Sequence, residues 1–245
     1  MATALEHLGS RVAAGLAAAA VVVVAAAAAP VVASQTRPEP SATPALPLRA
    51  PTPEAFLSAP WTIEGQVHGD LDGDRRDDVA VTWVPTVSAV GADSDTTERQ
   101  RALLILLRQA DGQYRRVAFT ETVLQCPSCG GAYYGTADAP VRVAIVKGIV
   151  VVTQEHGSRN VVEQTFRFKY EPMTDRLWLV GLDLSDEDRA TGQLVRQSTN
   201  FLTGQRMVTK SQFDQGTQQF VIRSRTRSRA GRSRIPIEQV DYRAY

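Results

Sequence analysis

Lysine, cysteine and histidine are scarce in this chain of 245 residues. Its lysines are Lys147, Lys169 and Lys210, so arginine supplies most of the positive charge, and the formal net charge is +1. This balance gives no overall polarity that would attract nucleic acid. The sequence also has no Walker loop, dinucleotide fingerprint, nucleophile elbow or metalloprotease helix motif, which argues against the enzyme classes that those motifs identify.

The two cysteines, Cys126 and Cys129, are separated by two residues and followed by two glycines. A local disulfide is the first interpretation, and a thiol–disulfide redox pair is the alternative, because a Cys-x-x-Cys spacing can make one thiol reactive. Redox chemistry usually needs the first cysteine at a helix N-terminus, and the glycines oppose a helix. A zinc site would need two further ligands, and the only histidines after the N-terminal segment are His68 and His156.

An apolar run, mostly of alanine and valine, extends from Val12 to Ala33, directly after Arg11. Such a run is typical of an export signal, and the small side chains before Ser34 predict cleavage after Ala33. An uncleaved membrane anchor is the alternative, since the run reaches the roughly 20 apolar residues that a membrane helix needs. We therefore expect a periplasmic or secreted protein. If the segment is retained, it would anchor the protein in the inner membrane, and we expect contact with a membrane only in that case.

The rest of the chain divides by composition into three parts. Seven prolines between Gln35 and Pro60 predict a stiff, extended linker over residues 34–60. Residues 61–210 are about 150 in number, a size that can bury a core, and we expect one domain there. The arginine-rich residues 211–245 are predicted to form a C-terminal tail.

Apolar residues in the domain come as short β-branched runs rather than at helical spacing, which predicts a mainly β, antiparallel single domain, with an α+β arrangement as the alternative. A two-residue turn is expected at Lys147-Gly148, and a four-residue hairpin turn is expected at residues 110–113. Residues 87–100 and the acidic run from Asp183 to Asp188 are interpreted as solvated loops. The expected strands are residues 61–68, 78–84, 101–109, 114–119, 141–146, 149–154, 161–170 and 176–182.

The strongest chemical signal is a run of aspartates between the first two expected strands. Asp70, Asp72 and Asp74 stand at every second position, and Asp78 follows four residues later. A tight loop can point these carboxylates and one backbone carbonyl at a single point, which is the all-oxygen shell that hard cations prefer. Without a cation, two carboxylates 4 Å apart in water repel by roughly 1 kcal/mol. The sequence therefore predicts calcium as the cofactor, in a structural rather than a catalytic role.

Residues 69–81 resemble the calcium loop of the FG-GAP and VCBS repeat families, whose pattern is roughly Gly-Asp-x-Asn/Asp-Gly-Asp-Gly-x-x-Asp before an apolar strand. The resemblance implies that Arg76 lends its backbone carbonyl to the cation and that Asp77 faces outward. The side-chain ligands that it implies are Asp70, Asp72, Asp74 and Asp78.

The sequence departs from that pattern at Arg75, where the families have a glycine in a left-handed turn. A side chain there costs about 1 kcal/mol. Those families build β-propellers from tandem copies of the loop, and this sequence has one copy, so a propeller is not expected.

More of the chain resembles a group of uncharacterised exported bacterial proteins that combine one such loop with several later segments. This resemblance implies an exported single-domain protein and names no activity. The segments that carry it are residues 103–114, 126–131, 155–159, 166–170, 178–181 and 198–204.

The leading functional prediction is an exported, non-catalytic binding or structural protein with one calcium loop, whose partner is an unknown envelope protein or an anionic polymer. An envelope enzyme with a site around His156 is one alternative, because Glu155 and Ser158 stand close to it in sequence. Catalytic groups must meet in space, however, and neighbours along one strand point apart.

The other alternative is a binder of anionic envelope material through residues 223–229, where arginine occupies every second position. Lipid A phosphates, acidic polysaccharide or an anionic membrane surface would suit such arginines, whereas nucleic acid is not expected outside the cytoplasm. The simpler interpretations are a solvated tail or an edge strand that charge protects from pairing.

Overall fold

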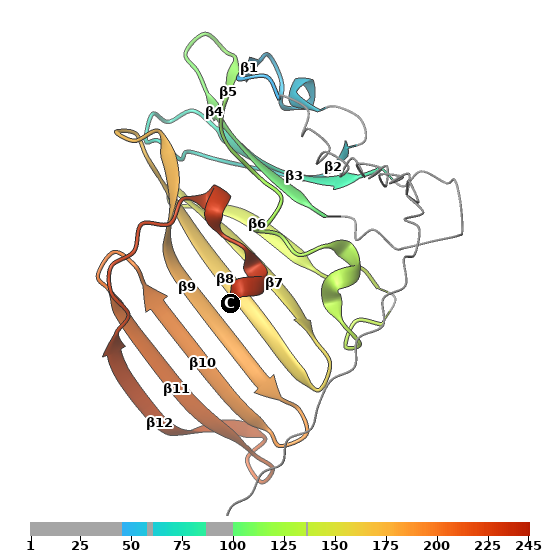
Figure 1. The fold of residues 1–245 in the computed structure, drawn as a ribbon, viewed down its shortest axis with the longest axis vertical. Coiled ribbons are helices and arrows are strands. Elements are labelled where there is room, and N and C mark those ends of the chain that lie inside the picture. Colours follow the sequence, from blue (N-terminus) through green and yellow to red (C-terminus); the bar gives the residue numbers. More distant parts are fainter. Residues whose placement is uncertain (1–45, 58–60, 87–99, 136) are drawn as a thin grey trace, which may run out of the picture. The chain divides into compact units, whose positions relative to one another are not determined.

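The computed structural model describes residues 46–57, 61–86, 100–135 and 137–245. In this part of the chain the strands form two antiparallel sheets, and there is no α-helix (Figure 1). The mainly β, antiparallel prediction is thereby confirmed. No helix among these residues is long and apolar enough to span a membrane. The expected signal, residues 1–33, and most of the expected loop at residues 87–100 lie outside the described residues.

The first sheet has five strands in the order β1-β5-β4-β3-β2. Both faces of its central strands are covered, which explains their continuous apolar sequence. Ile105 of β4 packs in the core between the sheets, while its neighbour Leu104 packs with Trp83 on the opposite face. The strands are β1 (Arg49–Ala50), β2 (Trp61–Gly69), β3 (Asp78–Pro85), β4 (Ala102–Arg108) and β5 (Tyr114–Thr120).

The second sheet has seven strands in the order β12-β11-β10-β9-β8-β7-β6. Phe166 and Phe168 of β8 alternate with polar residues and are fully buried in the core cluster shared with the first sheet. The strands are β6 (Val141–Val146), β7 (Ile149–Gly157), β8 (Asn160–Glu171), β9 (Arg176–Asp188), β10 (Gln193–Asn200), β11 (Gln205–Asp214) and β12 (Gln219–Arg229).

Both predicted turns lie where the sequence places them. Lys147 and Gly148 connect β6 to β7 with φ values of +51° and +75°, which is the pair of left-handed residues that a tight hairpin turn requires. The turn at residues 110–113 connects β4 to β5, with Gly112 at φ +83°. The eight expected strands all occur, with ends that differ by a few residues.

The acidic run from Asp183 to Asp188 is not a loop, and this interpretation was wrong. It forms the second half of β9 and pairs with β10 over its whole length. Strands β10, β11 and β12 were also missed. Few of their residues are buried, so they lack the apolar pattern on which strand prediction depends.

The domain begins earlier than the expected linker boundary at residue 60. Arg49 and Ala50 form β1 and pair with β5, and a short 3-10 helix follows at Pro53–Phe56. Phe56 is 1% exposed and belongs to the apolar cluster on the outer face of the first sheet. The described residues of the proline-rich segment therefore cover that face rather than extend away from it.

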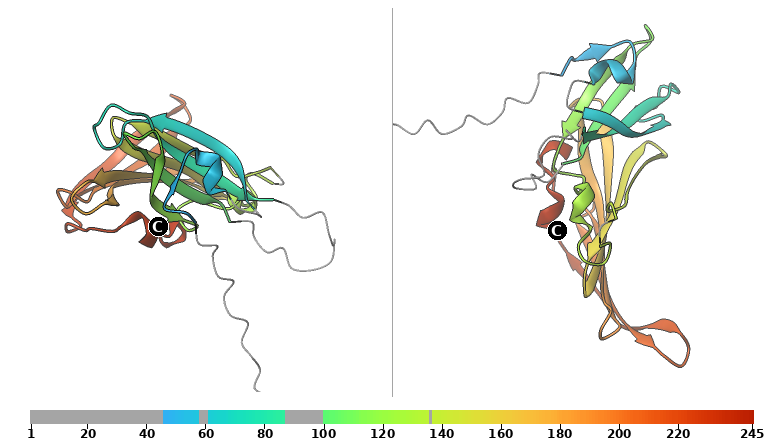
Figure 2. Two further views of the ribbon diagram at one scale, coloured as in Figure 1. Left: turned by 90° about the horizontal axis from the view of Figure 1, so that it is seen from above. Right: turned by 90° about the vertical axis from the view of Figure 1, so that its right-hand side faces the viewer.

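The domain also continues beyond residue 210, where the tail was expected to begin. β11 passes through this boundary, and β12 extends the same sheet. The chain then returns across the sheet, so that its last residues lie over β7 and β8 (Figures 1 and 2). Ile237, Val240 and Tyr242 are buried there in the core cluster, in or beside the short helices Ile237–Gln239 and Tyr242–Ala244.

Candidate functional site

The aspartate loop connects β2 to β3 and brings three of the four predicted carboxylates together. Ligand oxygens of Asp70, Asp72 and Asp78 all lie within 4.8 Å of one another. Two of these residues are partly exposed, and Asp78 is fully buried at the start of β3. Oxygen atoms at this spacing can share one cation of the size of calcium.

Hydrogen bonds from backbone N–H groups to carboxylate side chains hold the loop in a tight turn. Asp70 accepts from the Gly73 N–H through Oδ1 at 2.7 Å and from the Arg75 N–H through Oδ2 at 3.0 Å. Gly73 and Arg75 have φ values of +87° and +68°, so the chain reverses through two left-handed residues. Arg75 thus occupies the left-handed conformation at the position where the repeat pattern has a glycine.

Asp78 fixes the loop to the first sheet. Its Oδ2 accepts from the Leu71 N–H at 2.7 Å, and its Oδ1 accepts from the Arg108 N–H at 2.8 Å. Burial raises the pKa of Asp78 to about 6, although these two hydrogen bonds oppose the rise. Each carboxylate oxygen has a second lone pair, so both remain able to bind a cation, whose charge would favour the ionised form.

The pKa of Asp72 is also raised. Its Oδ1 accepts from the Asp74 N–H at 3.1 Å. Partial burial raises the pKa of Asp72, and the negative charges of Asp74 and Asp70 add to the rise. Several carboxylates are thus held close together at an energetic cost that a bound cation would offset.

Asp74, the fourth predicted ligand, faces a different partner. Its carboxylate forms an ion pair with the Arg76 guanidinium, and its Oδ1 accepts from the Arg76 N–H at 2.8 Å. The Arg76 Nε also donates to the Arg108 carbonyl at 3.1 Å. A role for Asp74 as a ligand would require its side chain to turn away from this ion pair. Asp77 is exposed, as the resemblance implies.

The loop lies against the second sheet. A groove of about 550 Å³ has Asp70 and Asp72 on one side and Lys147, Gly148 and Tyr170 of the second sheet on the other. A Cβ atom on Gly69, just before the loop, would lie 2.7 Å from Cγ2 of Ile145 in β6. Glycine is therefore needed at this position for the two sheets to approach.

Cys126 and Cys129 form the predicted disulfide. Cys129 lies in a single 3-10 turn, Pro127–Gly130, which begins directly after Cys126, and no longer helix follows it among the described residues. Cys126 is fully buried. A disulfide of this kind is typical of proteins that fold in an oxidising, extracytoplasmic compartment.

Among the described residues, no hydrogen bond connects His156 with Glu155 or Ser158. Glu155 and His156 are neighbours in β7 and so point to opposite faces, and the Glu155 carboxylate accepts from the Tyr134 hydroxyl. Burial raises the pKa of Tyr134 to about 12, and the hydrogen bond to Glu155 adds to this. No described residue forms a hydrogen bond with the buried Nδ1 of His156. Ser158 lies in the next turn, where its N–H donates to the Asn160 carbonyl at 2.9 Å.

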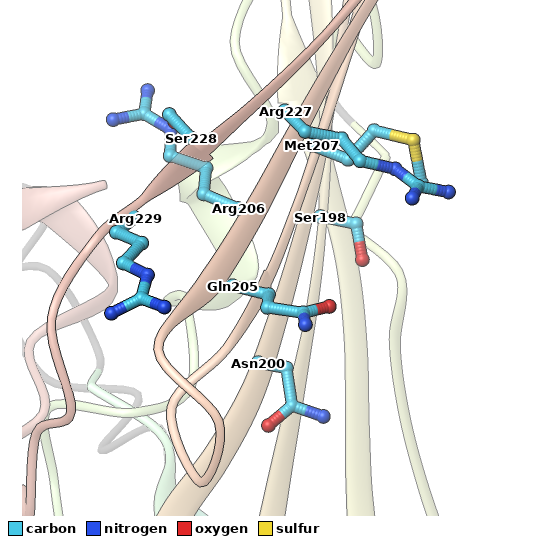
Figure 3. A pocket seen from close by; sticks show the side chains of 8 residues that line it. All are labelled: Ser198, Asn200, Gln205, Arg206, Met207, Arg227, Ser228 and Arg229. Carbon is cyan, nitrogen blue, oxygen red and sulfur yellow. The ribbon is translucent and has the colours of Figure 1, made fainter.

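The arginines at residues 223–229 lie in β12 rather than in a free tail. An open groove of about 450 Å³ runs over the ends of β10, β11 and β12 (Figure 3). Arg227 lies there on the same side of the sheet as Met207 and Ser198. The residues from β10 and β11 were not predicted, because nothing local in their sequence marks them as neighbours of the arginines.

Comparisons with protein-family models, with curated proteins and with solved structures find no match to this chain.

Proposed function

We propose that this protein is an exported, non-catalytic β-sheet module in which one calcium ion organises the loop between β2 and β3. The observation that carries the proposal is the convergence of the Asp70, Asp72 and Asp78 oxygens within 4.8 Å. The similarity of residues 69–81 to the FG-GAP and VCBS calcium loops supports it independently of the geometry.

The chemistry of the donor set favours calcium over the transition metals. All three carboxylates are hard oxygen donors, and the group contains no cysteine or histidine. Bound calcium would neutralise the carboxylates and hold the loop in one conformation between β3 and the β6–β7 hairpin. The module would then present its surfaces to an envelope partner, which the sequence does not name.

We further propose a periplasmic or secreted location. The disulfide fits an oxidising compartment, and the apolar run at residues 12–33 resembles an export signal. Retention of that run as an inner-membrane anchor is the alternative. Edman sequencing of the protein isolated from its native host would distinguish cleavage after Ala33 from retention.

The decisive test of the calcium site is thermal unfolding of the full chain in excess EDTA, in millimolar calcium and in millimolar magnesium. The Asp72→Asn variant keeps an oxygen for the Asp74 N–H and loses the charge, so it should fold. The exposed Asp77→Asn is the matched control. A ligand at a hundredfold excess over its Kd stabilises the native state by about 2.7 kcal/mol, which raises Tm by several degrees.

We expect calcium to raise the Tm of the wild type and of Asp77→Asn, and to leave that of Asp72→Asn nearly unchanged. Calorimetric titration should give one calcium per chain. If all three proteins melt alike with and without calcium, the aspartate loop is a turn without a metal function, and the proposal fails.

A further inference from the structure

The second sheet carries an excess of positive charge at one end. Residues 193–229, which form β10, β11, β12 and their turns, contain seven basic side chains and one acidic side chain, in a chain of net charge +1. The acidic residue, Asp214, is engaged in its own turn, where its Oδ1 accepts from the Thr217 N–H at 2.8 Å. Most of this positive charge therefore has no compensation within the three strands.

The charge is concentrated on β12, where exposed arginines alternate with serine and threonine. Arg225 pairs across the ladder with Thr209, and Arg227 pairs with Met207, so both arginines point to one face. Figure 3 shows Arg227 on this face beside Met207. Neither arginine has a carboxylate partner among the described residues.

Two arginines beside β9 are paired with carboxylates of that strand. Arg159 contacts Asp188 and Arg167 contacts Asp183, each with a nitrogen–oxygen distance of 2.7 Å. Both aspartates lie on β9, which is three strand spacings, or about 14 Å, from β12. Exposed charges at that separation are screened, because the Debye length is about 8 to 10 Å in physiological salt. The carboxylates of β9 therefore do not neutralise the arginines of β12.

β12 is also a free edge. It is the last strand of its sheet, and β11 is its one ladder partner in the described part of the chain (Figure 1). Its 11 residues therefore present a row of outward N–H and C=O groups to which an extended chain can add. Pairing with the β12 strand of a second copy would place arginines opposite arginines, which is unfavourable. The edge therefore suits an acidic occupant.

We propose that β12 accepts an acidic, extended segment of a partner protein as an additional strand of the sheet. The partner's carboxylates stand at alternate positions, opposite Arg225 and Arg227. Side chains two residues apart are about 6.7 Å apart along both strands, and directly opposed Cβ atoms lie about 5 Å apart, so the two series of charges stay in register. Arginine then binds each carboxylate with the planar, two-point geometry that favours this pairing.

The test uses the full chain and a labelled synthetic peptide of 11 residues in which glutamate and threonine alternate, with binding followed by fluorescence anisotropy. One control peptide has the same composition with its glutamates in a single block. The other keeps the alternating sequence but carries N-methyl groups on alternate amides, which preserves charge and removes hydrogen-bond donors from one edge. Heparin serves as a polyanion without a peptide backbone.

We expect the alternating peptide to bind at least tenfold more tightly than either control peptide and to slow amide hydrogen exchange in β12. The variant Arg225→Glu/Arg227→Glu should lose at least tenfold in affinity. The matched variant Arg142→Glu/Arg176→Glu changes two exposed arginines on β6 and β9 and should retain binding. All four substitutions are at exposed positions, so unchanged Tm values will show that both variants are folded.

Three results would overturn the proposal. Equal binding of the N-methylated peptide and of heparin, without protection of β12, would identify a general polyanion surface. Concentration-dependent dimerisation with protection of β12 would identify a second copy of the chain as the occupant. Failure of the alternating peptide to bind at millimolar concentration would show that the edge is only protected by charge. None of these results depends on calcium, so the test is separate from that of the aspartate loop.

Discussion

The guanidinium of Arg101 binds the carboxylate of Glu64 across the end of the first sheet. Its Nε lies 2.7 Å from Oε2 and its Nη2 lies 2.6 Å from Oε1 of Glu64. Its Nη1 donates to the backbone carbonyls of Gln125 and Ala139 at 3.2 and 3.0 Å. Arg101 is 3% exposed, so one buried cation connects the edge strand β2 to two segments that flank the disulfide.

Replacement of Glu64 by alanine should destabilise the protein by about 2 to 3 kcal/mol, because it leaves the Arg101 guanidinium buried without its counter-charge. This decrease in the free energy of unfolding is smaller than that for breaking a fully buried ion pair, because the Glu64 side chain is 33% exposed. Urea unfolding will measure it. Glu238→Ala, at an exposed glutamate, is the control and should change stability by less than about 0.5 kcal/mol. Equal effects of the two substitutions would contradict this role of Glu64.

Replacement of Arg75 by glycine should stabilise the protein by about 0.5 kcal/mol. Arg75 has a φ of +68°, a left-handed conformation that costs a residue with a side chain about 1 to 2 kcal/mol and costs glycine little. The greater conformational freedom of glycine stabilises the unfolded chain by a smaller amount. Arg76→Gly is the matched control, because Arg76 is outside the left-handed region and binds Asp74. That variant should be less stable than the wild type. If both variants lower the midpoint of urea unfolding, the strain at Arg75 is not relieved by glycine.

The fold was predictable where burial imposes a pattern on the sequence. In β8, Phe166 and Phe168 alternate with Arg167 and Lys169, so one face of the strand can be read directly. β12 has an equally regular alternation, but of arginine with serine and threonine, and both types are exposed. Its strand conformation depends on pairing with β11, which no local pattern encodes.

The candidate site was predictable where its geometry is local. Asp70 and Asp72 converge because only one residue of a tight loop, Leu71, lies between them. The orientation of Asp74 was not predictable, because it depends on an ion pair with Arg76. The anchoring of Asp78 was also missed, because its partner is the N–H of Arg108, 30 residues further along the chain.

His156 should lower the stability of the protein as the pH drops through the range in which an exposed histidine titrates, whereas Asp78, with its pKa raised to about 6, contributes with the opposite sign. Burial lowers the pKa of His156, although the charge of Glu155 opposes the shift. The unfolded chain therefore takes up a proton at a higher pH than the native state does. The contribution of His156 is fully present above about pH 6.5 and decreases below it.

The measurement is the free energy of unfolding at pH values between 5 and 8 for the wild type and for His156→Gln. Other groups that titrate in this range are common to both proteins, so the difference between the two curves isolates the histidine. The wild type should lose more stability than the variant between pH 7.5 and pH 5. Parallel curves would show that His156 has the same proton affinity in both states.

The C-terminal residues should contribute to the stability of the core as much as a strand does. Ile237 is fully buried, and the Val240 carbonyl accepts from the Thr122 hydroxyl at 2.7 Å. The side chain of Gln164 in β8 donates to the Tyr242 carbonyl at 3.1 Å. Deletion of residues 222–245 would be the simplest test of whether the arginines of β12 bind the cell envelope. It would also remove the C-terminal segment that packs on the core, so a loss of binding could not be assigned to the arginines.

A point substitution separates the two roles. Ile237→Ala should destabilise the protein by about 3 kcal/mol, because it leaves a cavity between the C-terminal segment and the second sheet. The exposed Ile222→Ala in β12 removes the same atoms and should cost less than about 1 kcal/mol. Urea unfolding with tryptophan fluorescence measures both, and comparable losses would show that the C-terminal segment detaches readily. The expected tenfold loss of peptide affinity in Arg225→Glu/Arg227→Glu should be absent in Ile237→Ala under conditions where that variant is folded, because Ile237 lies in the core and not on the β12 edge.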